Sequence, residues 1–89
     1  MKAIVTVVGR DQVGIIAGVC GTLAQHGVNV LEISQTIMQR TFTMIMLVEW
    51  TAGAPEFDTV QARVTEKGDQ MGLSIRIQRQ DIFTAMHTI

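Results

Sequence analysis

The sequence is short of the residues on which several classes of protein depend. Its 89 residues include one cysteine, one tryptophan, three phenylalanines and no tyrosine. The single thiol, Cys20, cannot form an internal disulfide, so nothing indicates a secreted, disulfide-stabilised domain. With so few aromatic side chains, we expect no platform on which nucleic-acid bases stack.

The sequence also has little excess of charge of either sign and no long apolar run. The net charge is −1, and the seven lysines and arginines form no cluster, so a nucleic-acid partner is not expected. The N-terminal apolar run ends at Val8, which is too short for a signal peptide or a membrane span. We therefore expect a cytoplasmic protein that does not contact membranes.

Apolar residues make up 47% of the chain, enough for the core of one domain over residues 1–89. Hydrophobic periodicity predicts strands at 2–8, 28–39, 42–50 and 73–79, helices at 13–27 and 55–72, and a terminal helix at 81–88. The order β-α-β-β-α-β predicts an α+β, ferredoxin-like fold. In that fold a four-stranded antiparallel sheet carries both long helices on one face.

Both predicted helices have recognisable first residues. Asp11 is a plausible N-cap of the first helix, and Pro55 suits the first position of the second. Helical spacing assigns the first helix an inner face of Ile16, Val19, Cys20 and Leu23 and the second an inner face of Phe57, Val60, Val64 and Met71. Gly14, Gly18 and Gly21 then share the outer side of the first helix. Either they allow a subunit or a ligand to approach closely, or glycine arose there by drift at exposed positions.

The strand at 42–50 is apolar on both alternating sets, as expected of a strand that is buried on both faces. The helices cover only one face of the sheet. The other is then covered by the C-terminal segment, by another subunit or by both, unless an exposed apolar surface is tolerated there.

The stretch VVGRDQVGII (residues 7–16) places polar residues between two glycines, where a predicted strand ends and a predicted helix begins. Backbone amides at a helix start attract a carboxylate, and Asp11 beside them suits an ammonium group. Asn29, at the start of the second predicted strand, offers a donor and an acceptor. Together these groups suit an amino acid; otherwise Asp11 is only a cap and Asn29 only a turn residue.

The segment RDQVGIIAGVCGTLAQHGVNVLEISQ (residues 10–35) resembles the signature of the ACT domain, a small-molecule-sensing module of amino-acid metabolism. The matching residues are Asp11, Gly14, Leu23, Ala24, Gly27 and Asn29. The likeness spans the chain and is nearest to small free-standing bacterial members. Gln12 and Val13 depart from the frequent basic residue and proline, which leaves the identity of the ligand open.

The resemblance implies a homo-oligomer, a dimer or higher, in which an amino-acid effector binds between subunits and regulates allosterically without catalysis. No cofactor and no metal are expected. The ligand-binding positions that it implies are Arg10, Asp11, Gln12, Val13, Gly14 and Ile15 on one subunit and Val28, Asn29, Val30 and Leu31 on its partner. In this hypothesis the amides near Gly14 hold the ligand's carboxylate, and either Asp11 or a backbone carbonyl of the second predicted strand holds its ammonium group. Asn29 from the partner subunit closes the site.

Two alternatives remain. One is a ligand-free dimer that docks onto an enzyme or a transcriptional regulator as its protein partner. The other is an acylphosphatase-like enzyme, which VVGRDQVGII also resembles, although the first helix lacks the arginine that such enzymes carry and Asp11 would repel a phosphate. Cys20 and His26 are six residues apart on one helix and do not meet, so nucleophilic catalysis and a metal site are not expected.

Overall fold

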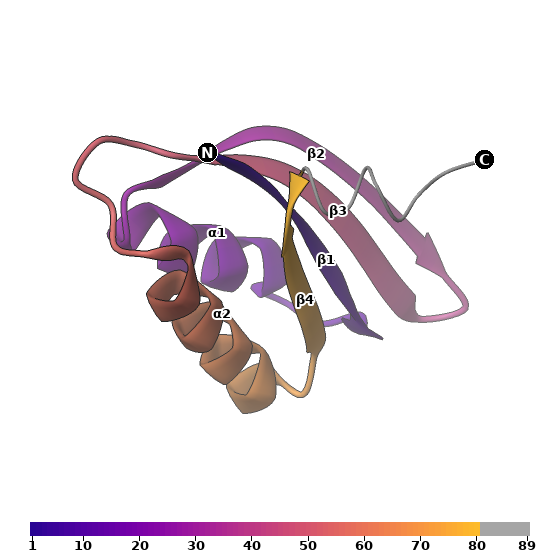
Figure 1. Ribbon diagram of the computed structural model, residues 1–89. Helices are drawn as coiled ribbons and strands as arrows, with labels where there is room; N and C mark the ends of the chain where they lie inside the picture. The colour runs from indigo at the N-terminus through magenta and orange to yellow at the C-terminus, as the bar shows by residue number, and fades with distance from the viewer. Residues whose placement is uncertain (81–89) are drawn as a thin grey trace.

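The computed structural model describes residues 1–80, in which strands and helices follow the order β-α-β-β-α-β (Figure 1). They are β1 (Lys2–Arg10), α1 (Ile15–Gln25), β2 (Val28–Met38), β3 (Thr41–Trp50), α2 (Phe57–Met71) and β4 (Ser74–Arg79). The strands form one antiparallel sheet in the order β2-β3-β1-β4, and both helices cover the same face (Figure 1). The predicted ferredoxin-like fold is confirmed, while the helix expected at 81–88 lies outside the described residues.

The core lies between the helices and the sheet. Alternate residues of β1 and β3 face the helices, as the period of two in a strand requires. Those with 3% exposure or less are Ala3, Val5, Val7, Phe42, Met44, Met46 and Val48. The second helix contributes Val60 and Val64, as the helical spacing predicts, and Trp50 stacks on Phe57 with the ring centroids 5.6 Å apart.

The other face of the sheet is also rich in apolar side chains. Ile4, Ile45 and Leu47 lie there, and together with Glu32 and Gln80 they border a shallow cavity of about 300 Å³. Ile45 is 46% exposed. The structure thus confirms that β3 is apolar on both sides, and a cover for this face stays a prediction.

The predicted inner face of the first helix is confirmed at Val19 and Leu23 and is wrong at Ile16. The structure buries Ile15, Val19 and Leu23, whereas Ile16, predicted to face inward, is 38% exposed. The helix begins at Ile15 rather than at Val13, and its buried residues follow one another at a spacing of four, which places Ile15, Val19 and Leu23 along one face.

The second helix begins two residues later than predicted. Phe57 is its first residue, Glu56 is its N-cap, and Pro55 stays in the preceding loop. The Pro55 carbonyl oxygen accepts a hydrogen bond of 3.0 Å from the indole Nε1 of Trp50, which holds this residue outside the helix. Gly72 ends the helix with φ 71°, as expected of a glycine C-cap.

The hairpin between β2 and β3 turns on Gln39 and Arg40. Both have positive φ angles, 50° and 68°, a pair of left-handed residues that matches the twist of a two-residue hairpin. Residues other than glycine and asparagine adopt this left-handed conformation at a steric cost in free energy. Gln39 and Arg40 are the only non-glycine residues with positive φ in the part of the chain that the structure describes.

Arg40→Gly is expected to raise the free energy of unfolding by about 0.5–1 kcal/mol, because glycine adopts a positive φ without steric cost. Urea denaturation of the two proteins measures the difference. Arg40→Ala is the control, since alanine removes the same side chain and keeps the steric cost. An equal gain from both variants would show that the backbone conformation is not the cause.

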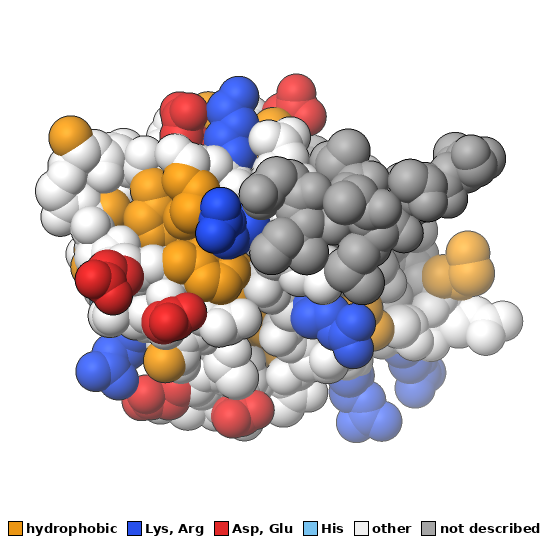
Figure 2. All heavy atoms as spheres, viewed as in Figure 1, with side chains coloured by type: hydrophobic (Ala, Val, Ile, Leu, Met, Phe, Trp, Pro, Cys, Tyr) orange, Lys and Arg blue, Asp and Glu red, His pale blue; other side chains and the backbone are white. Residues whose placement is uncertain are grey.

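Neither helix of the described residues is long and apolar enough to cross a membrane. On the face drawn in Figure 2, acidic and basic side chains surround a patch of hydrophobic ones.

Candidate functional site

The loop after β1 is held by backbone geometry rather than by a side-chain cap. Gly14 is the N-cap of α1 and has φ 88°, a conformation that favours glycine. Asp11, predicted as the N-cap, does not cap the helix; its backbone N–H donates to the carbonyl oxygen of Arg40 at 2.8 Å. The prediction fails because β1 continues to Arg10, which moves the helix start beyond the reach of Asp11.

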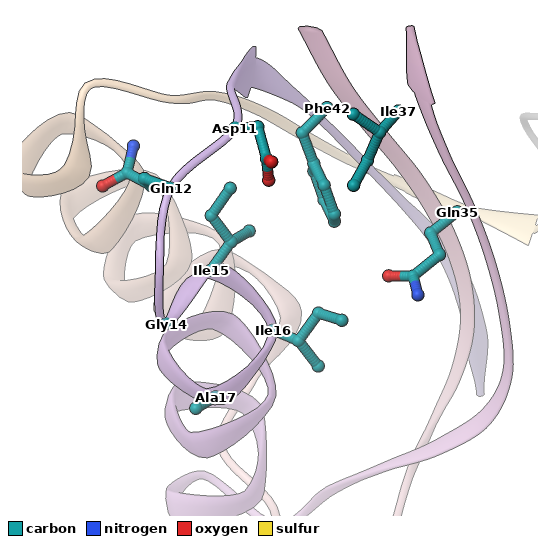
Figure 3. A pocket seen from close by; sticks show the side chains of 9 residues that line it. All are labelled: Asp11, Gln12, Gly14, Ile15, Ile16, Ala17, Gln35, Ile37 and Phe42. Atoms are coloured by element: carbon teal, nitrogen blue, oxygen red, sulfur yellow. The ribbon is translucent and has the colours of Figure 1, made fainter. Parts of the chain in front are cut away.

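This loop borders an open cavity of about 360 Å³ on the helix-covered side of the sheet (Figure 3). Ile15 and Phe42, which are 2% and 3% exposed, form its apolar base. The Asp11 carboxylate points toward these two side chains, and Gln35 of β2 lies across the cavity from them. A carboxylate, an amide and an apolar base therefore surround one space, whose size suits a small organic molecule.

Three of the predicted loop residues have other surroundings. Gln12 points away from the cavity, and its Nε2 donates to the carbonyl oxygen of Met71 at 2.9 Å, which ties the loop to the end of α2 (Figure 3). Arg10 pairs with Thr41 in the sheet, and Val13 is fully exposed; neither lines the cavity. Of the predicted loop positions, the cavity brings together Asp11, Gly14 and Ile15, and Gln12 borders it with its side chain turned away.

The predicted residues of the second segment, Val28–Leu31, lie at the opposite end of β2 from the cavity. Asn29 pairs with Glu49, whereas Gln35 and Ile37, which line the cavity, pair with Met44 and Phe42. Within one copy of the chain the loop and Asn29 are thus not brought together.

The outer edge of β2 is free in the described part of the chain. The strand lies at the end of the sheet and pairs only with β3 among residues 1–80. It is 11 residues long and carries one charged residue, Glu32. Its large exposed apolar residues are Leu31, Ile33, Ile37 and Met38, with exposed fractions of 39%, 45%, 57% and 68%. A long apolar edge strand of this kind is a template for pairing with another strand.

The glycines of α1 do not form one contact surface. A Cβ atom at Gly18 would lie 3.0 Å from the Sδ of Met71 and 3.2 Å from the Cε of Lys67, so Gly18 lets α2 of the same chain approach. Gly14 is needed for its backbone conformation. A Cβ atom added at Gly14 or at Gly21 would meet nothing within 4 Å. Because the backbone conformation already accounts for Gly14, the choice between a close contact and drift at an exposed position stays open for Gly21 alone.

The candidate nucleophile and metal ligands lie apart from the cavity. Cys20 is half-buried with its Sγ 3.8 Å from the Sδ of Met46, and burial raises the pKa of the thiol, which keeps it protonated at neutral pH. His26 is held at the end of α1, with its Nδ1 2.8 Å from the carbonyl oxygen of Thr22. Residues 1–80 contain no group of three histidine, cysteine or acidic side chains that is placed to hold a metal ion.

Sequence reasoning missed the wall of the cavity that β2 and β3 provide. Gln35, Ile37 and Phe42 reach the loop because of the strand register, in which Ile37 pairs with Phe42 across the two-residue turn. The alternation of Ile33, Gln35 and Ile37 was a usable signal, since it places an amide between apolar residues on the helix-covered side.

The chain matches the family model described as "ACT domain" over residues 2–78. It is 52% identical over 89 residues to a UPF0237 protein of Clostridium acetobutylicum, with all of both chains covered. A UPF0237 protein of Methanocaldococcus jannaschii is 40% identical over 88 residues, which cover 99% of this chain and 98% of that protein.

Solved structures agree with this match. An ACT domain protein from Streptococcus pneumoniae has a TM-score of 0.81 and 37% identity, covering 100% of this chain and 97% of that chain. A proposed glycine cleavage system transcriptional repressor has a TM-score of 0.77 and 26% identity, covering 89% of this chain and 45% of that one. By its family match, its relatives and its fold, the chain belongs to the ACT domain family.

Proposed function

We propose that the chain is a free-standing regulatory ACT domain that binds an amino-acid effector between two copies of itself and catalyses no reaction. The observation that carries the proposal is the cavity beside the β1–α1 loop, which lies against the strand whose outer edge is free in the described residues. Its lining offers binding groups: the Asp11 carboxylate, the Gln35 amide and apolar side chains.

The groups at the cavity suit the two charged ends of an amino acid. The Asp11 carboxylate accepts hydrogen bonds from the ligand's ammonium group. The first turn of α1 receives no side-chain cap from Gly14, so its free backbone N–H groups are available to the ligand's carboxylate. Gln35 adds an amide on the opposite side.

Pairing of two β2 edges would complete the site. A symmetric antiparallel pair centred near Ile33 places the start of one β2 beside the end of the other. The partner's Val28–Leu31 then lies next to Gln35 and Ile37 of the first copy. By register Val28 and Val30 point to the helix-covered side and Asn29 to the other side. Asn29 is the second residue of β2, so the partner's Asn29 would reach the ligand around the end of the paired strands.

A thermal-shift titration against each standard amino acid tests the proposal. An effector that binds only the folded protein adds about 2.7 kcal/mol of stability at a hundredfold excess over its Kd. In a domain of this size that raises the Tm by roughly 10 °C or more. We expect one or a few amino acids to do so with the wild type, and the shift to disappear in Asp11→Asn and in Asn29→Ala.

Asp69→Asn is the matched control, because Asp69 is exposed on α2 and does not line the cavity. Its Tm should rise with the effector as in the wild type. If no amino acid raises the Tm of the wild type at millimolar concentration, the proposed effector class is wrong.

The competing function is a ligand-free module that docks onto another protein. The complete exposure of Val13 beside the exposed Ile16 favours it, since an isoleucine and a valine in contact with water suit a protein interface. Under this function free amino acids leave the Tm unchanged, and Val13→Asp abolishes capture of the partner without changing the fold.

A further inference from the structure

We infer, on the basis of the proposed function, that the cavity selects amino acids with apolar side chains, and that Ile37 and Ile16 determine this selectivity. The two side chains flank the opening above the buried base of Ile15 and Phe42 (Figure 3). They are 57% and 38% exposed, so each presents apolar surface that an apolar ligand removes from water.

The charge of the cavity lining disfavours amino acids with acidic or basic side chains. Asp11 is the one charged residue among the described lining residues, and in the proposed complex its carboxylate pairs with the ligand's ammonium group. An acidic side chain would be repelled by this carboxylate and would meet no lysine or arginine among them. A basic side chain would lie against the isoleucines without a second carboxylate. Burying a charge without a partner is costly, so both classes are expected to bind more weakly.

The other polar side chains of the lining, Gln12 and Gln35, offer no hydrogen-bond partner to the ligand's side chain. The Gln12 amide is engaged with the carbonyl oxygen of Met71 and points away from the space. Gln35 is the remaining polar side chain of the lining, and its amide suits the ligand's carboxylate. A polar ligand side chain thus finds no dedicated partner, and the selection follows from the apolar walls.

Isothermal titration calorimetry with L-leucine, L-serine, L-glutamate and L-lysine tests the inference. We expect leucine to bind at least tenfold more tightly than the other three. Ile37→Asp should weaken leucine binding at least tenfold and strengthen lysine binding. Thr36→Asp is the control, because it adds the same charge to the neighbouring residue, which the register places on the other face of β2, and it should bind leucine as the wild type does.

Ile16→Asp provides a second variant should Ile37→Asp not fold, and circular dichroism identifies the folded proteins. If glutamate, lysine or serine binds more tightly than leucine, the selectivity is overturned and the proposed function stands. Unchanged leucine binding by the folded isoleucine variants overturns the role of Ile37 and Ile16. If none of the four binds and no standard amino acid raises the Tm in the thermal-shift titration, the inference and the proposed function fail together.

Discussion

Replacement of Gly68 with valine is expected to lower the free energy of unfolding by roughly 2–3 kcal/mol, the typical cost of adding side-chain carbons to a packed core. Gly68 is buried in α2 where the helix meets the turn into β4. A Cβ atom there would lie 2.8 Å from Cδ1 and Cγ1 of Ile75 and 3.2 Å from the carbonyl oxygen of Leu73. The isoleucine side chain has some freedom to move, but the carbonyl belongs to the backbone that begins β4.

Thermal or urea denaturation measures this effect. In a domain of this size the expected loss corresponds to a fall in Tm of roughly 10–20 °C. Gly21→Ala is the matched control, because nothing lies within 4 Å of the added Cβ in the middle of α1. That variant should gain up to about 1 kcal/mol from helix propensity. Equal stability of Gly68→Val and the wild type would contradict the close approach of α2 to β4.

Ile33→Lys is expected to convert the proposed dimer into a monomer. Ile33 lies at the middle of β2, so a symmetric antiparallel pair of β2 strands brings this position close to its own copy. Two lysines would then face each other, and like charges opposite one another destabilise strand pairing. Sedimentation velocity should show a fall from the mass of two chains to that of one chain, 9.8 kDa.

The control is Thr59→Lys, which adds the same charge at an exposed position of α2, away from the edge strand. It should sediment as the wild type does. Retention of the dimer by Ile33→Lys would show that the chain associates through another surface. The apolar face around Ile45 and Leu47 would then be the next surface to change.

The order of strands and helices was predictable because each element carries a strong local pattern. β-Branched residues in β1 and the alternation in β4 indicate strands, and Gly27 and Gly72 mark the ends of the helices. The start of α1 was not predictable in the same way. Asp11 is the more common type of N-cap, but the extension of β1 to Arg10 through pairing with β3 outweighs that preference, and Gly14 takes its place.

The candidate site was predictable in part for a related reason. The loop residues Asp11 and Gly14 are neighbours in sequence, so their types and spacing indicated a binding loop. Gln35 and Ile37 join them through long-range pairing that depends on the register of a hairpin. That hairpin turns on Gln39 and Arg40, which lack the glycine or asparagine that normally marks such a turn.

The most direct test of the central claim, a site shared by two copies, is effector binding to a mixed dimer. One copy carries Asp11→Asn and the other Asn29→Ala, and different affinity tags on the two allow the mixed dimer to be purified. Each variant alone should lose binding. If the loop of one copy and the start of β2 of the other form each site, the mixed dimer retains one intact site and binds half as much effector as the wild type. A mixed dimer that binds none would contradict the account, because both residues would then act within the same copy.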